Sequence, residues 1–200
     1  MKQLFAGVAG ILAALALSGC ASGPRGAGWT TLIDGSAGMD NFVVSGSAAN
    51  WRAEDGAIQA DKAPSKDVSV LVTKQTFRDF DLYAEFWAAD DTNSGIYLRV
   101  RNPTAVSTAS GAYEVQIWDR NPKPEYSTGS LVNVATVQPI HKAGGHWNTY
   151  EVHAQGPVIT VKFNGVQTVT ANDGRFPEGR IGLQFNGGVI KFRKLLVKPL

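Results

Sequence analysis

The sequence contains very little cysteine and methionine, and from Trp29 onward it has no stretch in which apolar residues recur with the period of a long helix. Cysteine occurs once and methionine twice in 200 residues. One cysteine excludes a disulfide framework, so the folded domain has to be stabilised by a hydrophobic core. The missing helical period excludes a helical bundle.

Strong charge and the common phosphate-binding motifs are also missing. Charged residues make up 18% of the chain and the formal net charge is +2. There is no glycine-rich loop after a strand, no nucleophile elbow and no cysteine nucleophile, which argues against nucleotide use and against acyl transfer by those routes. The basic residues at 191, 193, 194 and 198 alternate with apolar ones, which favours a strand with one solvated face. We therefore expect no nucleic-acid partner.

The first twenty residues have the order of an export signal. Lys2 precedes an apolar or small stretch over residues 4–17, and this stretch is too short to span a bilayer. The following Leu17-Ser18-Gly19-Cys20 resembles the lipobox of bacterial lipoproteins, in which the cysteine is lipidated and becomes the first residue of the mature chain. The alternative is an ordinary secretory cleavage that leaves Cys20 as an unpaired thiol near the start of the mature chain.

We therefore predict a signal peptide over residues 1–19, lipidation of Cys20, a flexible tether over residues 20–28 and one domain over residues 29–200. The tether is rich in glycine and other small residues and has no apolar period. The expected location is the bacterial cell envelope, with the membrane as a partner through the lipid. Ala21 favours the outer membrane in organisms that sort lipoproteins by this residue.

Short alternating runs rich in Val, Ile, Phe, Tyr, Trp and Thr recur after Trp29, with turn residues between them, and predict an all-β domain. So many strands in one domain imply a sandwich of two packed sheets. Asn164-Gly165 between two such runs predicts a β-hairpin. The predicted strands are 41–45, 50–53, 57–60, 68–72, 79–88, 95–101, 112–119, 131–136, 148–155, 158–164, 166–171, 180–186 and 188–198.

Three of these strands, within 82–87, 96–101 and 113–118, alternate between apolar residues and charged, amide or aromatic ones. Alternate side chains point to opposite faces of a strand. If the three strands are neighbours, their second faces form one surface that resembles a sugar-binding floor, because aromatic rings stack on sugar rings while carboxylates, amides and guanidinium groups bind hydroxyls. The alternative is an exposed face with cross-strand charge pairs, such as Glu85 with Arg99. The expected surface consists of Tyr83, Glu85, Trp87, Tyr97, Arg99, Glu114, Gln116 and Trp118.

Carboxylates on this surface are the candidate acid and base groups. Glu85 and Glu114 can divide these roles if their environments separate their pKa values. Asp119 follows at the end of a strand, where it either takes part in chemistry or opens a turn. The histidines at 141, 146 and 153 lack metal-ligand spacing, and we interpret them as ordinary surface residues. A divalent metal held by one histidine and carboxylates stays open as a cofactor.

Several segments together resemble the bacterial 3-keto-disaccharide hydrolase or 3-keto-glucoside lyase/hydratase family, over residues 29–200. Each segment is weak alone, but their order and spacing are specific. They are Gly28-Trp29-Thr30-Thr31-Leu32-Ile33-Asp34-Gly35, Trp51-Arg52-Ala53-Glu54-Asp55-Gly56, Phe80-Asp81-Leu82-Tyr83-Ala84-Glu85-Phe86, Asn93-Ser94-Gly95-Ile96-Tyr97-Leu98-Arg99, Tyr113-Glu114-Val115-Gln116-Ile117-Trp118-Asp119, Gly145-His146-Trp147-Asn148 and Gly182-Leu183-Gln184.

The resemblance implies a concanavalin A-like jelly roll of two antiparallel sheets, and chemistry on a sugar that is already oxidised at carbon 3. The ketone acidifies the hydrogen at carbon 2, a base removes it, the glycosidic oxygen leaves carbon 1, and water then adds. This sequence departs from the family pattern at two positions. Many members have histidine where this chain has Asn186, and a basic residue is commoner where it has Trp87. The residues that the resemblance places at the site are Glu85, Asn93, Arg99, Glu114, Gln116 and Asp119.

The expected function is therefore cleavage of a keto-glycoside by a lipid-anchored enzyme. Glu114 or Glu85 is expected as the base and Arg99 or a bound cation as the enolate stabiliser. The substrate-binding residues are expected to be Asn93, Tyr97, Arg99, Gln116, Trp118 and Gln184. A non-catalytic carbohydrate-binding lipoprotein is the second hypothesis, and a structural envelope protein is the third.

Overall fold

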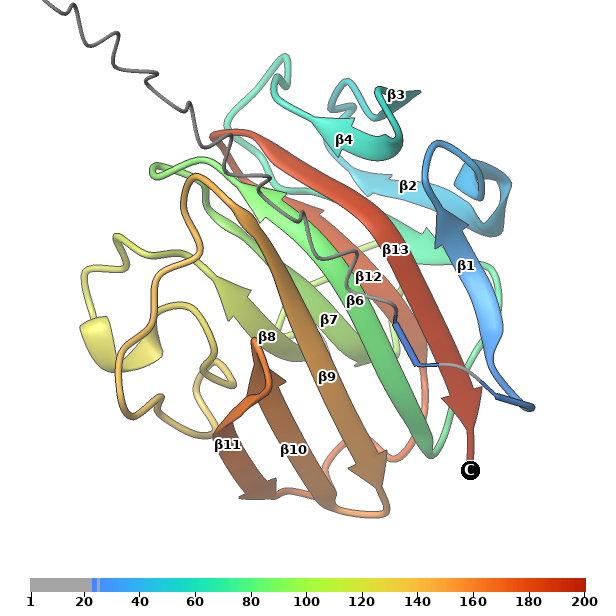
Figure 1. Cartoon of the computed structure of the whole chain (residues 1–200), viewed down its shortest axis with the longest axis vertical. Coiled ribbons are helices and arrows are strands. Elements are labelled where there is room, and N and C mark those ends of the chain that lie inside the picture. The colour runs from blue at the N-terminus through green and yellow to red at the C-terminus, as the bar shows by residue number, and fades with distance from the viewer. Residues whose placement is uncertain (1–22, 25) are drawn as a thin grey trace, which may run out of the picture.

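Two antiparallel sheets pack face to face (Figure 1) in the computed structural model, which describes residues 23–24 and 26–200. The predicted signal peptide and Cys20 lie outside the described residues. The larger sheet has the order β11-β10-β9-β6-β13-β4-β3, and β1 pairs with β13 beside this path. Its strands are β1 (Thr30–Asp34), β3 (Arg52–Glu54), β4 (Ala57–Ala60), β6 (Phe80–Ala88), β9 (Trp147–Gln155), β10 (Val158–Phe163), β11 (Val166–Asn172) and β13 (Ile190–Pro199).

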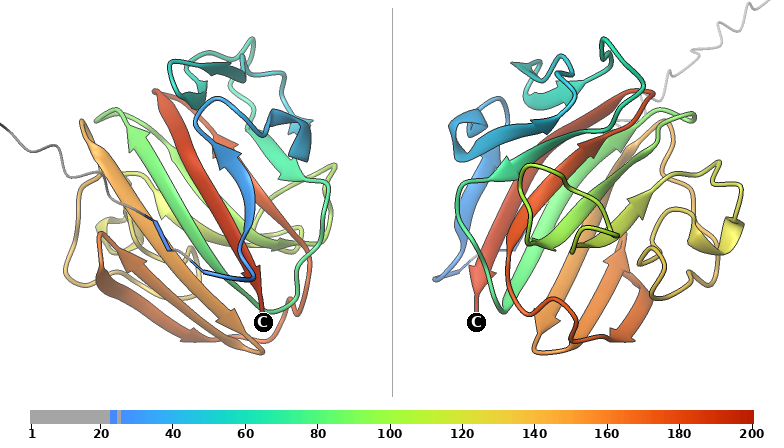
Figure 2. Two further views of the ribbon diagram at one scale, coloured as in Figure 1. Left: turned by 45° about the vertical axis from the view of Figure 1, so that its right-hand side comes forward. Right: turned by 180° about the vertical axis from the view of Figure 1, so that it is seen from behind.

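The smaller sheet has the order β2-β5-β12-β7-β8 and comes forward when the molecule is seen from behind (Figure 2). Two short 3-10 turns, η1 (Met39–Asn41) and η2 (Pro124–Tyr126), complete the regular structure of the described residues. No helix in this part of the chain is long and apolar enough to cross a bilayer. The strands are β2 (Phe42–Gly46), β5 (Ser69–Thr73), β7 (Ser94–Val100), β8 (Tyr113–Ile117) and β12 (Arg180–Phe185).

The all-β sandwich predicted from the alternating pattern is confirmed. The hairpin between β10 and β11 turns at Asn164 and Gly165, whose φ angles of 49° and 80° are the positive values that a two-residue turn requires. One predicted strand is wrong: 131–136 makes only isolated bridges at Leu131, because it runs beside β8 as a loop. The strand β1 was not predicted, since its residues Thr30–Asp34 do not alternate clearly.

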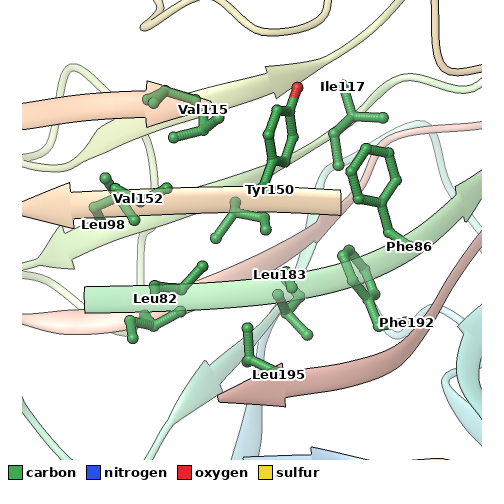
Figure 3. Packing of buried hydrophobic residues seen from close by; sticks show 14 of the residues in the cluster. Leu82, Phe86, Leu98, Val115, Ile117, Tyr150, Val152, Leu183, Phe192 and Leu195 are labelled. Atoms are coloured by element: carbon green, nitrogen blue, oxygen red, sulfur yellow. The ribbon is translucent and has the colours of Figure 1, made fainter. Parts of the chain in front are cut away.

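The apolar set of each alternating strand meets in a core between the two sheets (Figure 3). Phe86 stacks on Tyr150 with ring centroids 5.0 Å apart, and Phe192 packs against Phe86 with ring centroids 6.5 Å apart. The hydroxyl of Tyr150 crosses the core and donates to the backbone carbonyl of Gln116 at 2.6 Å. Because a buried hydroxyl needs a partner, this bond fixes β9 of the larger sheet against β8 of the smaller one.

Candidate functional site

Four polar side chains cluster on the outer face of the smaller sheet. Tyr97 lies directly opposite Glu114 in the register between β7 and β8, and Gly95 lies opposite Gln116. The neighbouring strand β12 places Gly182 beside Tyr97, so Gln184, two residues further on, extends the same face. The sequence prediction that Tyr97, Glu114 and Gln116 share one face is therefore confirmed. We call Tyr97, Glu114, Gln116 and Gln184 the polar face; each is at most 7% exposed.

Glu114 has an unusual environment for a carboxylate. Burial raises its pKa from 4.5 to about 7, and hydrogen bonds from the side chains of Tyr97 and Gln184 offset only part of that effect. Within residues 26–200, no basic side chain forms an ion pair with it. A carboxyl group with a pKa near neutrality can both accept and return a proton.

The space for this carboxyl group comes from Gly95. A Cβ atom at position 95 would lie 2.8 Å from Oε1 of Glu114 and 3.0 Å from the carbonyl oxygen of Val115, both too close for a side chain. Glycine inside a strand often marks a close approach by another group. In the sequence, Gly95 stands within the segment Asn93–Arg99, and a glycine inside a predicted strand is the signal that points to this role.

The amide of Gln184 joins two members of the polar face. Its Nε2 donates to the hydroxyl oxygen of Tyr97 at 2.8 Å. Its Oε1 is buried and has no hydrogen-bond partner among the described residues. A buried acceptor without a partner is costly, so this oxygen can take a hydrogen bond from a ligand hydroxyl.

A cavity of about 510 Å³ lies where β12 ends, and its lining on that strand begins at Phe185, one residue after Gln184, without including the four residues of the polar face. Asn186 follows two residues after Gln184, and Asn93 comes two residues before Gly95; both asparagines line the cavity. Their backbones also pair, because the nitrogen of Asn186 donates to the carbonyl of Asn93 at 3.0 Å. The loop between β4 and β5 contributes charged residues of both signs to the lining, Asp61, Lys62, Lys66 and Asp67. The volume is in the range of small-molecule sites.

Trp118 and Asp119 follow β8 beside the polar face, but the carboxylate of Asp119 is engaged. It accepts hydrogen bonds from the Thr128 hydroxyl at 2.6 Å and from the backbone nitrogens of Ala143 and Gly144 at 2.9 Å. Trp118 is half-buried, and its backbone nitrogen donates to Thr128. The contacts of Asp119 therefore support a role in holding the loop after β8 and give no support to a role in proton transfer.

Glu85 lies elsewhere, which corrects the expectation of one shared surface. Its strand β6 belongs to the larger sheet, so Tyr83, Glu85 and Trp87 face outward on the other side of the sandwich. There Glu85 accepts from Arg193 Nε at 2.5 Å and from the Tyr83 hydroxyl at 2.9 Å. Alternation indicates which side of a strand faces the core but does not indicate the sheet to which the strand belongs.

Arg99 is also absent from the polar face, because the chain bulges there. Arg99 has a positive φ of 53°, and the register between β7 and β12 shifts at this point, so the alternation reverses. Its side chain is fully buried and donates to the carbonyls of Arg78, Gly156 and Phe176 and to Asp79. The expected contact of Arg99 with an enolate is wrong, since these acceptors occupy the guanidinium group.

The residues present do not fit a metal centre. Within residues 23–24 and 26–200, no three His, Cys, Asp or Glu side chains are grouped closely enough to hold a metal ion. His153 pairs with Asp81 at 2.7 Å on the larger sheet, and the ring of His141 packs on Phe163.

The fold and the polar face define a jelly-roll sandwich of the galectin-like and concanavalin-like class that carries a nearly buried carboxyl group on one outer face. The family profile described as the 3-keto-alpha-glucoside-1,2-lyase-like domain matches residues 28–198. The chain belongs to this family, which ties it to glycoside chemistry. No curated protein sequence matches the chain.

Solved structures show the same fold at low sequence identity. A candidate glycosyl hydrolase from Parabacteroides distasonis ATCC 8503 superposes with a TM-score of 0.71 at 18% identity and covers 86% of this chain and 94% of that chain. A second candidate glycosyl hydrolase from the same organism gives 0.69 at 21% identity, with 86% and 99% covered. The carbohydrate-binding module CBM66 from Bacillus subtilis gives 0.58 at 15% identity, with 86% and 95% covered.

Proposed function

We propose that this protein breaks the glycosidic bond of 3-keto-glycosides by elimination, with Glu114 as the group that moves the proton. The observation that carries the proposal is the buried carboxyl group of Glu114, whose pKa is raised to about 7. A base poised near the working pH is the most effective one for removing a weakly acidic hydrogen. Family membership supports the substrate class.

The chemistry needs only one carboxyl group. The ionised Glu114 removes the hydrogen from carbon 2, and the electron pair of that C–H bond passes into the enolate of the carbon 3 ketone. The enolate then forms the double bond between carbons 1 and 2 as the bond from carbon 1 to the glycosidic oxygen breaks. Glu114, now protonated, returns its proton to the departing oxygen, and water can add to the unsaturated product afterwards.

The distribution of carboxylates favours elimination over hydrolysis by a carboxylate pair. Paired carboxylates in glycosidases lie about 5–10 Å apart on one site. Glu85 and Glu114 lie on opposite outer faces of two sheets that pack about 10 Å apart, so they cannot flank one bond. Asp119 is occupied by three hydrogen bonds.

Neighbouring groups on the polar face are suited to bind the sugar. Burial raises the pKa of Tyr97, so its hydroxyl stays protonated, and its one hydrogen is directed at the carboxyl group of Glu114, which it holds in place. Gln184 Oε1 offers an acceptor for a sugar hydroxyl. The cavity lined by Asn93 and Asn186 offers room for the other part of the substrate.

Incubation with a 3-keto-disaccharide tests the proposal. The wild-type protein should release the free sugar and an unsaturated or hydrated keto-sugar, and Glu114→Gln should lower kcat by roughly a hundredfold or more because a general base contributes that much. Glu85→Gln is the matched control and should retain activity, since it lies on the other face. Full activity of Glu114→Gln would contradict the proposal.

Sugar binding without cleavage is a second candidate, because the polar face has one free carboxyl group where many glycosidases have two. Under this alternative, the wild-type protein leaves the 3-keto-disaccharide unaltered and binds it, and Gln184→Leu weakens the binding. Calorimetric titration of the wild-type protein and of this variant, beside the cleavage assay, separates the two candidates.

We also propose that Cys20 carries the lipid that anchors the protein to the cell envelope. The support is the order of the first twenty residues, with a charged start, an apolar stretch and a lipobox. Mass spectrometry of the mature N-terminus should find a diacylglyceryl group on Cys20. The Cys20→Ser variant should lose both the lipid and membrane association.

A further inference from the structure

We infer that the outer face of the larger sheet lies against the lipid bilayer, so that the polar face of the smaller sheet points away from it. This inference rests on the proposed lipid anchor at Cys20. It also rests on the path of the first described residues and on the side chains of the larger sheet.

The N-terminal segment is seated on the larger sheet. Gly23 approaches Tyr83 so closely that a Cβ atom at position 23 would lie 2.7 Å from the Tyr83 ring. Together with Pro24 and Trp29, it lines a cavity of about 450 Å³ whose floor comes from β6, β9 and β10. Figure 1 shows the short trace of residues 23–24 in front of this sheet.

The length of chain up to the anchor limits where the lipid can be. Three residue steps separate Gly23 from Cys20. Each step spans at most about 3.6 Å, so a lipid on Cys20 would be tied to the contact with Tyr83 by a chain that reaches no farther than about 11 Å. The outer face of the smaller sheet is farther away by the interlayer spacing of about 10 Å and by its own side chains. An anchor at Cys20 therefore places the outer face of the larger sheet nearer to the membrane than the outer face of the smaller sheet.

The side chains of the larger sheet suit an anionic lipid surface. The charged residues of β6, β9, β10 and β13 are three acidic ones (Asp81, Glu85, Glu151) and five basic ones (Lys162, Lys191, Arg193, Lys194, Lys198). Glu85 pairs with Arg193, Asp81 with His153, and Lys194 with Asp34 of β1, so within the described part of the chain the basic residues of these strands without an ion pair are Lys162, Lys191 and Lys198. Lysines near a membrane surface are attracted by anionic headgroups.

Aromatic side chains on the same face fit the boundary between headgroups and acyl chains. Trp87 and Trp147 are half-buried on this surface, and basic groups lie over both rings: Lys191 Nζ is 5.5 Å from the centroid of Trp87 and the Arg193 guanidinium is 4.3 Å from that of Trp147. Amphipathic rings beside cations are typical of residues that meet a bilayer surface.

Single cysteines test the orientation, because the only natural cysteine is consumed by the lipid. Val158 on the larger sheet and Val43 on the smaller one are 37% and 43% exposed and provide matched sites on opposite faces. The full lipoprotein carrying V158C or V43C is labelled with an environment-sensitive dye. It is then reconstituted in vesicles of phosphatidylethanolamine and phosphatidylglycerol that contain a lipid with a nitroxide on its headgroup.

The dye at position 158 should be quenched roughly threefold or more strongly than the dye at position 43, since groups at the interface lie within about 10 Å of the headgroups. Equal quenching at both positions, or stronger quenching at 43, would overturn the inference. An error in the proposed lipid anchor gives a different result. A protein without the lipid lacks the mass increase of a diacylglyceryl group in mass spectrometry and does not co-float with the vesicles. Retention of the difference in the Glu114→Gln variant would show that the orientation does not depend on the proposed chemistry.

Discussion

The two outer faces of the sandwich each contain a buried glutamate, and the partners of these glutamates differ. Glu85 on the larger sheet is 3% exposed and meets a guanidinium group and a tyrosine hydroxyl. Glu114 on the smaller sheet is 7% exposed and meets a tyrosine and an amide. A cation beside a carboxylate stabilises its charged form, whereas burial without a cation favours the neutral form. Similar burial therefore yields an ion-paired carboxylate on one face and a titrating acid on the other.

The largest expected effect concerns the stability of the Glu114→Gln variant at alkaline pH. The folded protein holds the Glu114 proton up to a pKa of about 7, whereas the unfolded chain releases it near 4.5. Stability of the wild type should therefore fall as pH rises from about 4.5 to about 7, by roughly 3 kcal/mol at about 1.4 kcal/mol per pKa unit. The glutamine variant lacks this loss.

Urea unfolding at pH 4 and pH 8 measures this difference. Glu114→Gln should be more stable than the wild type at pH 8 and close to it at pH 4. Glu85→Gln is the control and should show no gain at pH 8. A glutamine variant that is less stable than the wild type at pH 8 would show that Glu114 has a cationic partner in solution.

The second expected effect is the loss of the ion pair on the larger sheet. Arg193→Leu leaves the carboxylate of Glu85 buried without a cation. The cost should be about 2 kcal/mol, below the range for fully buried pairs, because the Arg193 side chain is 36% exposed. In the double variant with Glu85→Leu, part of the lost stability should return, and a double-mutant cycle by urea unfolding measures that coupling.

The third expected effect is on catalysis at Gly95. Gly95→Ala forces its Cβ against Oε1 of Glu114, so the carboxyl group has to move. We expect kcat to fall roughly tenfold, since small displacements of a catalytic group are costly. Gly174→Ala is the control, because a Cβ there meets only Pro157 at 3.5 Å. Equal kcat values for the two variants would contradict the proposed position of the reacting group.

The smallest expected effect is at Lys191. Its ammonium group lies 5.5 Å from the centroid of the Trp87 ring on a solvated face, where such contacts contribute about 0.5 kcal/mol. Lys191→Ala should therefore lower the free energy of unfolding far less than Arg193→Leu. Equal losses of unfolding free energy in Lys191→Ala and Arg193→Leu would show that the surface contact and the buried ion pair do not differ in strength as proposed.

The sequence was sufficient for most of the strands, except β1 and the wrongly predicted strand 131–136, and for the direction of most side chains. Period-two alternation placed Tyr97, Glu114 and Gln116 on one face, and Asn164-Gly165 located a hairpin. It was not sufficient for Glu85, because the pairing of β6 with β9 and β13 depends on long-range packing that alternation does not encode. The expected alternative pair of Glu85 with Arg99 is replaced by Glu85 with Arg193.

The position of Arg99 shows a second limit of the sequence. A bulge with a positive φ at a non-glycine residue reverses the alternation, and no local signal announced it. The carboxylate pKa could not be predicted either, since it depends on burial from several strands at once. The role of Gly95 was easier to predict from the sequence, because a glycine inside a strand of bulky residues is a local signal.

The carboxylate of Asp119 has a consequence for how this protein can vary. Its bonds to Thr128, Ala143 and Gly144 close residues 120–142 into a loop whose base is pinned to the end of β8. The same loop is bonded along the strand that carries Glu114, because the nitrogen of Val132 donates to the carbonyl of Glu114 and the nitrogen of Gln116 donates to the carbonyl of Ser130. Changes of sequence at residues 129–132 are therefore less tolerable than changes at the exposed residues 122–125, which lie away from these bonds.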